Sequence, residues 1–460
     1  MLDRDRLQNL LADATYRQGL LEDLMKIMCY PTVSADPYYA QHVRDCAAYL
    51  ADFGKHQLAM KTEVVKTAGH PCVIMHSAPV PGAKSVLIYG HYDVQPAEDV
   101  ELWKVPPFEP YALDNVLHGR GACDDKGQFS IWLSALKSLR TLEGGYPLNV
   151  TVLLEGEEEI SSPNLKQVLL DKVEELRSDY IIVSDTSSAV KLVPTMHYSL
   201  RGVVGFEVHL RTAVQDLHSG VHGGVSPNAV IELTKIISQL HDKDCKVTVP
   251  GFYEGVRPME DWEAELLSKV PFNEKEYAEG FKTTMRGEVG FTTNERRWFR
   301  PTLDCNGIYG GYTGIGAKTI VPAVASAKFS ARIVVDQDPQ RVMDLLKKWF
   351  EDHTPEWCQL EFVPGDFSRP YLLDRDLVRV GLFKSIQEAM RHNFGCEPLI
   401  CRNGGAIGVV EDLNNILQAP VLLLGFGSPD DNLHGPNEKF ELANFFRGIA
   451  MGAELLHALA

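Results

Sequence analysis

Residues Thr151–Ser162 read TVLLEGEEEISS, an apolar run followed directly by the four carboxylates Glu155, Glu157, Glu158 and Glu159. The apolar part is typical of a buried β-strand, and the acids stand where that strand would end. Adjacent carboxylates repel one another unless water, helix dipoles or bound cations offset their charge. Alone, such a run is typical of a solvated turn, so its function depends on what the rest of the chain places beside it.

Apolar runs that end in polar residues also occur on both sides of this stretch. Ser85–Val94 (SVLIYGHYDV) and Tyr180–Asp185 (YIIVSD) have this form, and helical patterns separate the strands. One of these helices follows Asn164, where Ser162 suits the cap and Pro163 the first turn. The alternation predicts an α/β domain with a mainly parallel sheet flanked by helices. Sites in such sheets form at the carboxyl ends of the strands, where these polar residues stand.

The pattern changes from about Tyr198. The segments LRGVVGFEVHLRT and AKFSARIVVD alternate between apolar and polar residues, with the helical segment SPNAVIELTKIISQL between them. This order predicts a smaller antiparallel α+β domain. The rhythm of helix and strand returns after Tyr371. We therefore expect an α/β domain made of residues 1–195 and 343–460 and interrupted by an α+β domain of residues 196–342.

Composition limits the function classes. The chain has 460 residues, 45% hydrophobic and 23% charged, with a formal net charge of -17. This charge argues against nucleic acid or an anionic membrane as the main partner. No run approaches the roughly 20 apolar residues of a membrane helix, and the first residues lack the apolar core of a secretory signal. Nine cysteines without a CxxC pair indicate reduced thiols, so we expect a cytoplasmic protein.

Several ionisable residues stand at expected strand ends or in glycine-rich turns: His91, Asp93, Asp124, Asp185 and His434. Each one alone also suits a structural role. Together with the acids of the opening stretch they would gather at one edge of one sheet, where uncompensated charge is costly. Two divalent cations would offset it. Histidines and carboxylates without thiolates suit zinc, with manganese or cobalt as alternatives.

The ordered motifs of the chain resemble those of a known family over nearly its whole length. The family is that of dinuclear-zinc exopeptidases, which includes carnosinase-like cytosolic dipeptidases, acetylornithine deacetylase and carboxypeptidase G. The resemblance implies an α/β catalytic domain interrupted by a lid domain that also forms a homodimer. The motifs are GHYDVQP, HGRGACDDKG, EGEEEISS, VSD, HSGVHGG, GAKTIVP, CRNGGA and LHGPNE.

The resemblance also implies the metal ligands. Asp124 would bridge two ions, His91 and Asp185 would complete one site, and His434 and Glu159 would complete the other. Asp93, two residues after His91, would orient that histidine. The peptide bond after Asp124, which joins it to Asp125, is expected to be cis.

The implied reaction begins with a water molecule that bridges the two metals and whose pKa is lowered toward neutrality. Glu158 would be the general base that takes its proton and then protonates the leaving amine. Glu157 is interpreted as a spacer that faces elsewhere. His218, in DLHSGVHGG, matches a lid histidine that reaches the active site of the partner subunit and stabilises the oxyanion.

Four residues are expected near the substrate. Arg332, in KFSARIVVD, matches the arginine that pairs with the terminal carboxylate of the substrate, for which a planar fork of donors is suited. Thr319, in GAKTIVP, is expected nearby on the lid. Gly404 and Gly405 of CRNGGA are expected beside the substrate as well.

Two positions depart from the dipeptidase pattern. Ala406 stands where a hydroxyl residue is common in these enzymes, and Arg369 stands where a histidine is common. A second arginine in the substrate pocket would favour dipeptides that end in Asp or Glu. The alternative is a structural ion pair between Arg369 and an acid such as Asp366.

The favoured interpretation is a cytoplasmic, homodimeric metallopeptidase that cleaves dipeptides with a free C-terminal carboxylate. A deacylase of N-acyl amino acids is the second interpretation, because it would use the same metals and the same Glu158. The third, a catalytically silent binding protein with the same fold, is disfavoured because no ligand and no base is missing from the sequence.

Overall fold

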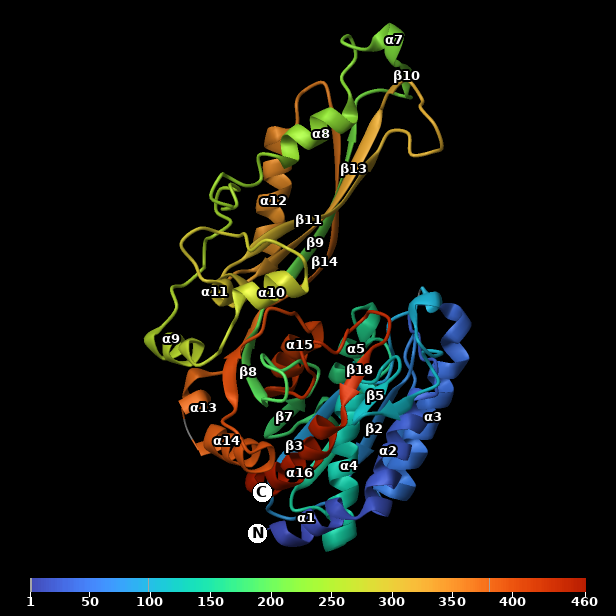
Figure 1. Ribbon diagram of the computed structural model, residues 1–460, viewed down its shortest axis with the longest axis vertical. Coiled ribbons are helices and arrows are strands. Elements are labelled where there is room, and N and C mark those ends of the chain that lie inside the picture. The colour runs from blue at the N-terminus through green and yellow to red at the C-terminus, as the bar shows by residue number, and fades with distance from the viewer. Residues whose placement is uncertain (1, 98, 380) are drawn as a thin grey trace.

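A computed structural model of the chain describes residues 2–97, 99–379 and 381–460. It has two parts that follow one another along the long axis (Figure 1). The large part contains both termini and most of the helices. The small part, residues 202–368, extends from it as a narrow α+β unit. The α/β fold with an inserted α+β segment is thus confirmed.

The large part is built on a nine-stranded sheet of order β1-β2-β6-β3-β7-β17-β8-β15, with β16 paired to β8. Its centre, β6-β3-β7-β17, is parallel. The pairs β1-β2, β2-β6, β17-β8 and β15-β8 are antiparallel. The sheet is therefore mixed, not mainly parallel, because antiparallel neighbours such as β1 and β2 need only a short connection. The strands are β1 Lys61–Val65, β2 Cys72–His76, β3 Ser85–His91, β6 Asn149–Glu155, β7 Tyr180–Val183, β8 Thr195–Leu200, β15 Tyr371–Leu372, β16 Leu399–Arg402 and β17 Val421–Gly425.

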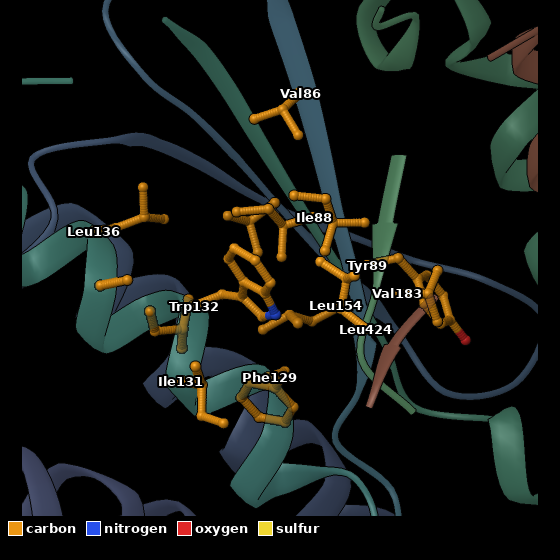
Figure 2. Packing of buried hydrophobic residues seen from close by; sticks show 14 of the residues in the cluster. Val86, Ile88, Tyr89, Phe129, Ile131, Trp132, Leu136, Leu154, Val183 and Leu424 are labelled. Carbon is orange, nitrogen blue, oxygen red and sulfur yellow. The ribbon is translucent and has the colours of Figure 1, made fainter. Parts of the chain in front are cut away.

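Helix α4 carries the main packing contact with the centre of this sheet. Figure 2 shows Trp132 of α4 among side chains of β3, β6, β7 and β17. Its indole nitrogen donates a hydrogen bond of 2.7 Å to Ser184, directly after β7, so the buried polar atom of the ring is satisfied. The helices of the large part are α1 Arg4–Ala12, α2 Ala14–Met28, α3 Ala40–Gln57, α4 Lys126–Glu143, α5 Leu165–Asp171, α6 Val173–Leu176, α13 Arg375–Arg379, α14 Gly381–Phe394, α15 Gly408–Leu417 and α16 Leu442–Leu459.

Short elements complete the large part. A three-stranded sheet of order β18-β5-β4 is formed by Lys439–Glu441, Val116–His118 and Tyr111–Leu113. The 3-10 turns are η1 Pro37–Tyr39, η2 Val100–Leu102 and η3 Glu158–Ile160. Helix α5 begins at Leu165, and its N-cap is Asn164. The prediction that Ser162 caps this helix is therefore wrong. The hydroxyl of Ser162 donates to the Glu155 carboxylate at 2.9 Å instead.

The small part has an antiparallel sheet of order β11-β13-β9-β14. Side chains of α8 and α12 share its core. At the end farthest from the large part lie α7 and the pair β10-β12 (Figure 1). Its elements are β9 Gly202–Arg211, β10 Leu217–His218, α7 Ser219–His222, α8 Ala229–Ile237, α9 Asp261–Ser268, α10 Glu274–Gly280, α11 Thr293–Trp298, β11 Thr302–Gly310, β12 Ile320–Val321, β13 Val324–Ile333, α12 Pro339–His353 and β14 Gln359–Ser368.

The sheet crossings differ from the expected domain boundaries. The expected boundary at 196 lies inside β8, which belongs to the large sheet, and the chain crosses to the small sheet at Arg201. The return occurs between β14 and β15, well after residue 342. Leu346 and Phe350 of α12 are buried in the small core. The amphipathic pattern of α12 predicts a helix with a buried face, but it does not show which sheet that face covers.

None of the helices in the described residues has the length and apolar character that crossing a membrane requires.

Candidate metal centre

The ends of three neighbouring strands place the acids of the opening stretch beside His91. β6, β3 and β7 are parallel neighbours, and His91 pairs in register with Glu155. Glu158 and Glu159 follow β6 in η3, and Asp185 follows β7. Because parallel strands end at the same edge of the sheet, their terminal side chains gather there. Asp124, just before α4, and His434, in the loop before β18, complete the group.

The distances define two overlapping sets around Asp124. Nε2 of His91 lies 3.0 Å from Oδ1 of Asp124 and 4.0 Å from Oδ1 of Asp185. Nε2 of His434 lies 3.0 Å from Oδ2 of Asp124 and 3.5 Å from Oε2 of Glu159. Asp124 thus uses one oxygen toward each histidine, which is the arrangement that a bridging carboxylate needs.

Glu158 lies inside the same group. His91, Glu158 and Asp185 offer ligand atoms within 4.8 Å of one another, and so do His91, Asp124 and Glu159. Glu159 is held by Gln95, whose backbone N–H and side-chain amide donate to it at 3.1 and 2.7 Å. The geometry therefore brings both acids to the site and leaves the division into ligand and base as a prediction.

The other two acids of the opening stretch serve the structure around the site. The Glu157 carboxylate accepts hydrogen bonds from the backbone N–H of His70 and from Asn164, both at 2.8 Å. Glu155 accepts from Tyr89 at 2.5 Å, besides Ser162. Glu157 thus faces elsewhere, as the sequence interpretation holds.

Asp93 connects His91 with the acidic turn. One carboxylate oxygen of Asp93 is 3.4 Å from Nδ1 of His91, whose other nitrogen faces Asp124. The same carboxylate accepts the backbone N–H groups of Glu158 and Glu159 at 3.2 and 3.1 Å. Asp93 therefore orients the imidazole and holds the turn that presents both glutamates.

Burial acts to raise the pKa values of Asp124, Glu158, Glu159 and Asp185, and neighbouring charges add to this effect or oppose it. Burial raises the pKa of Glu159 to about 8, and repulsion from Asp124 adds to this effect. Burial, with repulsion from Asp124, also raises the pKa of Asp185 well above its usual range. Although burial opposes it, contact with His434 and His91 lowers the pKa of Asp124. Burial lowers the pKa of His91, but Asp124 and Asp93 outweigh it and raise that pKa.

Divalent metal ions fit this donor set. Nε2 of His91 is buried and, among the residues that the structure describes, has no hydrogen-bond partner although it faces carboxylates. Two donors about 2.0–2.1 Å from one tetrahedral ion are roughly 3.3 Å apart, and the separations of 3.0 to 4.0 Å within each set are close to this value. A cation between the donors would offset the repulsion that otherwise protonates the acids.

The peptide bond between Asp124 and Asp125 is cis, as predicted.

Sequence reasoning missed Glu438, which holds the loop that carries Asp124. Its buried carboxylate accepts the backbone N–H groups of Gly121, Cys123 and Asp124 at 2.9, 2.9 and 3.0 Å. It also pairs with Arg120 at 2.8 Å. Its position four residues after His434, in LHGPNE, was the only signal in the sequence.

Arg120, the partner of Glu438, also contacts the loop that carries His434. Its Nη2 donates to the backbone oxygen of His434 at 3.0 Å. The buried ion pair of Arg120 and Glu438 therefore ties the loop of Asp124 to the loop of His434. We call this pair the loop clamp.

His218 and Thr319 lie apart from the metal centre in the same chain. His218 is exposed in β10, at the end of the small part farthest from the large part (Figure 1). β10 pairs with β12, and the backbone oxygen of Thr319 accepts the N–H of Ser219 at 3.0 Å. The two residues are thus neighbours, but neither joins the metal cluster within one chain.

Gly404 and Gly405 lie where the two parts meet. A Cβ atom on Gly404 would stand 2.8 Å from the backbone oxygen of Arg297 and 3.2 Å from the Arg201 guanidinium, so a side chain there is excluded without rearrangement. The backbone N–H of Arg201 donates to the oxygen of Gly405 at 3.1 Å. Arg332, on β13, lines a cavity together with Arg201.

Arg369 is exposed and forms ion pairs across the two parts. It contacts Asp338 at 2.6 Å and Glu411 at 3.5 Å, so Asp338 and Glu411 take the place that the sequence suggested for Asp366. Asp338 caps α12 of the small part, and Glu411 lies on α15 of the large part. The charge of Arg369 is therefore compensated in this structure.

The family follows from the sequence match. The model of peptidase family M20/M25/M40 matches residues 87–458, which include every candidate ligand. The chain therefore belongs to this family of peptidases. This confirms the resemblance that the ordered motifs indicate.

Relatives agree with this assignment. The Cys-Gly metallodipeptidase DUG1 of Candida albicans is 30% identical over 459 residues, which cover 95% of this chain and 94% of that protein. The human Beta-Ala-His dipeptidase is 28% identical over 401 residues, which cover 85% of this chain and 78% of the relative.

Solved structures show the same architecture. The M20 metallo-carboxypeptidase Sso-CP2 of Sulfolobus solfataricus superposes with a TM-score of 0.85 at 29% identity, covering 96% of this chain and 99% of the other. Human carnosine dipeptidase 1 superposes with a TM-score of 0.86 at 25% identity, covering 100% of this chain and 99% of the other.

Proposed function

We propose that this protein is a dinuclear metallopeptidase that hydrolyses dipeptides with a free C-terminal carboxylate. The observation that carries the proposal is the bridging geometry of Asp124, with one oxygen 3.0 Å from each of two histidines and further carboxylates beside both. Membership of a peptidase family and relatives named as dipeptidases support the same activity.

In this proposal each ion has three protein ligands. His91, Asp124 and Asp185 hold one ion, and His434, Asp124 and Glu159 hold the other, in keeping with the separations within each set. Imidazole and carboxylate donors suit zinc, with manganese or cobalt as alternatives. Bound metal ions at such a site polarise the scissile carbonyl and make water acidic enough to serve as a nucleophile near neutral pH.

The protein supplies the proton transfers. Glu158, presented by the turn that Asp93 holds, takes the proton of the attacking water and delivers it to the leaving amine. Proton transfer of this kind contributes about 10²- to 10⁴-fold to the rate. Arg332 binds the terminal carboxylate of the substrate, and Thr319, Gly404 and Gly405 are assigned to the substrate pocket.

We also propose that the small part is a lid through which two copies form a homodimer. Its far end carries exposed apolar side chains, among them Val221, Val225 and Ile315. The distance of His218 from the metal centre of its own chain supports a role in the site of the partner, where its imidazole would stabilise the oxyanion.

The nine free cysteines support the cytoplasm as the compartment.

The decisive experiment measures amine release by the metal-reconstituted protein. The substrates are neutral dipeptides and, for comparison, the corresponding N-acetyl amino acids. We expect release from the dipeptides, abolition by a chelator and restoration by Zn²⁺, Mn²⁺ or Co²⁺. Faster hydrolysis of the N-acetyl amino acids would identify a deacylase, and no hydrolysis of either class by the metal-loaded protein would refute the proposal.

A further inference from the structure

Two cavities with shared lining residues lie beside the Gly404–Gly405 loop and Arg332. The first, of ≈ 750 Å³, is lined by residues that follow Asp185 in the chain, Ser187 and Ser188, and by the Gly404–Gly405 loop. The second, of ≈ 890 Å³, contains Arg332. Both are lined by Arg201, Tyr277 and Arg297. These shared residues therefore join the cavity beside the Gly404–Gly405 loop to the cavity that contains Arg332.

The second cavity is positively charged in an acidic protein. The formal net charge of the chain is -17, yet arginines outnumber acids by six to three in this lining. Such a local excess raises the concentration of anionic ligands at the cavity. The charged residues are Arg201, Arg286, Arg296, Arg297, Arg300 and Arg332, with Asp242, Glu288 and Asp304.

The three acids of the cavity already accept hydrogen bonds from groups other than Arg201, Arg297 and Arg332. Glu288 pairs with Arg300, with its Oε2 2.7 Å from Nε. Asp242 accepts the backbone N–H groups of two nearby loop residues at 2.9 Å. Asp304 accepts the hydroxyl of Thr302 at 3.0 Å and attracts both Arg201 and Arg332. The Asp304 carboxylate is therefore the one acid of the cavity that attracts both Arg201 and Arg332, and its single charge cannot offset both guanidinium groups.

Of the six arginines of this lining, only Arg300 forms an ion pair within the described residues, and Arg286 and Arg296 donate to Cys245 and to the backbone oxygen of Glu288. Within residues 2–97, 99–379 and 381–460, Arg201, Arg297 and Arg332 have no carboxylate within 4.0 Å. Nε of Arg201 donates to the backbone oxygen of Gly404 at 2.8 Å, which fixes this guanidinium in place. Burial, with repulsion from Arg332 and Arg297, lowers the pKa of Arg201 to about 10. An anion bound here would relieve that repulsion.

Arg297 is the arginine best placed to receive a further carboxylate. Its guanidinium lies 5.3 Å from the ring centre of Phe272 and 5.4 Å from that of Trp298. Ring contacts of this kind hold a guanidinium by its face and leave the N–H donors at its edge available. A planar fork of donors matches the two oxygens of a carboxylate.

We propose that Arg201, Arg297 and Arg332 form one subsite for a C-terminal residue with two carboxylates, so that peptides ending in Glu or Asp are preferred. Arg332 takes the main-chain carboxylate, Arg297 takes the side-chain carboxylate, and Arg201 adds positive charge between them. The inference rests on the proposed dipeptidase function and deepens it. It assigns to Arg297 the specificity that sequence reasoning gave to Arg369, whose charge is compensated by Asp338 and Glu411.

The test compares two isosteric substrates, Ala-Glu and Ala-Gln, on the metal-loaded enzyme. We expect kcat/KM to favour Ala-Glu and Arg297→Gln to reduce that preference about tenfold or more, because a hydrogen-bonded charge pair has roughly that value. Arg341→Gln removes an exposed arginine paired with Glu254 on the small part and serves as the charge-matched control. Its ratio should equal that of the wild type.

Arg369→Gln is the discriminating variant, because it should leave the Ala-Glu to Ala-Gln ratio unchanged. A tenfold loss in Arg369→Gln with no loss in Arg297→Gln would overturn the assignment. Equal rates for Ala-Glu and Ala-Gln in the wild type would also overturn it while leaving the dipeptidase function intact.

A binding measurement separates the two proposals. By calorimetry, free glutamate should bind the metal-loaded protein at least tenfold more tightly than glutamine, and Arg297→Gln should remove this difference. If the protein cleaves no dipeptide, the proposed function fails, and this measurement still decides whether the arginines form an acidic-residue subsite. No preference for glutamate would refute the subsite.

Discussion

Replacement of Glu438 by Gln tests whether the loop clamp holds the metal centre together. Glu438 is fully buried and accepts hydrogen bonds from Arg120 and from the backbone N–H groups of Gly121, Cys123 and Asp124. Glutamine has nearly the same size as glutamate, but it carries no charge. Its amide also replaces one acceptor oxygen by an N–H₂ donor, which would face the N–H groups that Glu438 now accepts.

The size of the effect follows from the burial of the pair. Arg120 is only 2% exposed, so Glu438→Gln leaves a buried guanidinium without its counter-ion. Loss of one partner of a buried ion pair costs about 3–5 kcal/mol. We therefore expect the free energy of unfolding to fall by about 3–5 kcal/mol. The matched control is Glu397→Gln, whose carboxylate is 72% exposed beside Arg391 and whose loss should leave the free energy of unfolding nearly unchanged.

Two measurements check this prediction. Urea unfolding in the presence of a chelator gives the stability change without any contribution from bound metal. Calorimetric titration with Zn²⁺ gives the metal affinity, which should fall about 10- to 100-fold because the clamp positions both Asp124 and His434. If Glu438→Gln and Glu397→Gln unfold alike, or if Glu438→Gln binds zinc as tightly as the wild type, the reasoning is wrong.

Three further predictions concern the reaction and the assembly. Glu158→Gln should keep its bound metal and lose at least about 10²-fold in kcat, whereas Glu159→Gln should lose metal; the reverse result would exchange the two assignments. Mixing inactive His218→Ala with inactive Glu158→Gln subunits should restore partial activity, and no recovery after verified subunit exchange would place His218 outside the partner site. Saturating zinc, at about 100 times Kd, should stabilise the metal-free protein by roughly 2.7 kcal/mol, and an unchanged melting temperature would argue against a resident metal.

Local pattern was enough to predict most elements and the gathering of ionisable residues at one edge of the sheet. The apolar runs at Ser85–His91, Asn149–Glu155 and Tyr180–Val183 are strands, and the polar residues after them meet at one edge of the sheet. These features are predictable because the spacing of apolar residues indicates whether a segment is a helix or a strand, and because the carboxyl ends of parallel strands lie at one edge of the sheet. Ordered motifs added the family and the cis peptide after Asp124.

Tertiary structure alone decided which surfaces meet. The amphipathic pattern of α12 was visible in the sequence, but its burial against the small sheet moved the second crossing beyond residue 342. Strand direction at the sheet edges was likewise not encoded in any periodic pattern, since a strand has the same alternation in either direction.

The same limit applies to the residues that sequence reasoning missed. Glu438 contacts a loop more than 300 residues earlier in the chain, and Arg297 lies on a helix of the small part while Gly404, beside it, lies on the large part. A motif shows which residue types are present, but the energy of an ion pair depends on burial and on partners brought together by folding. The sequence therefore determined which ionisable side chains the candidate metal centre contains, and the fold decided which charges around it are compensated and which are not.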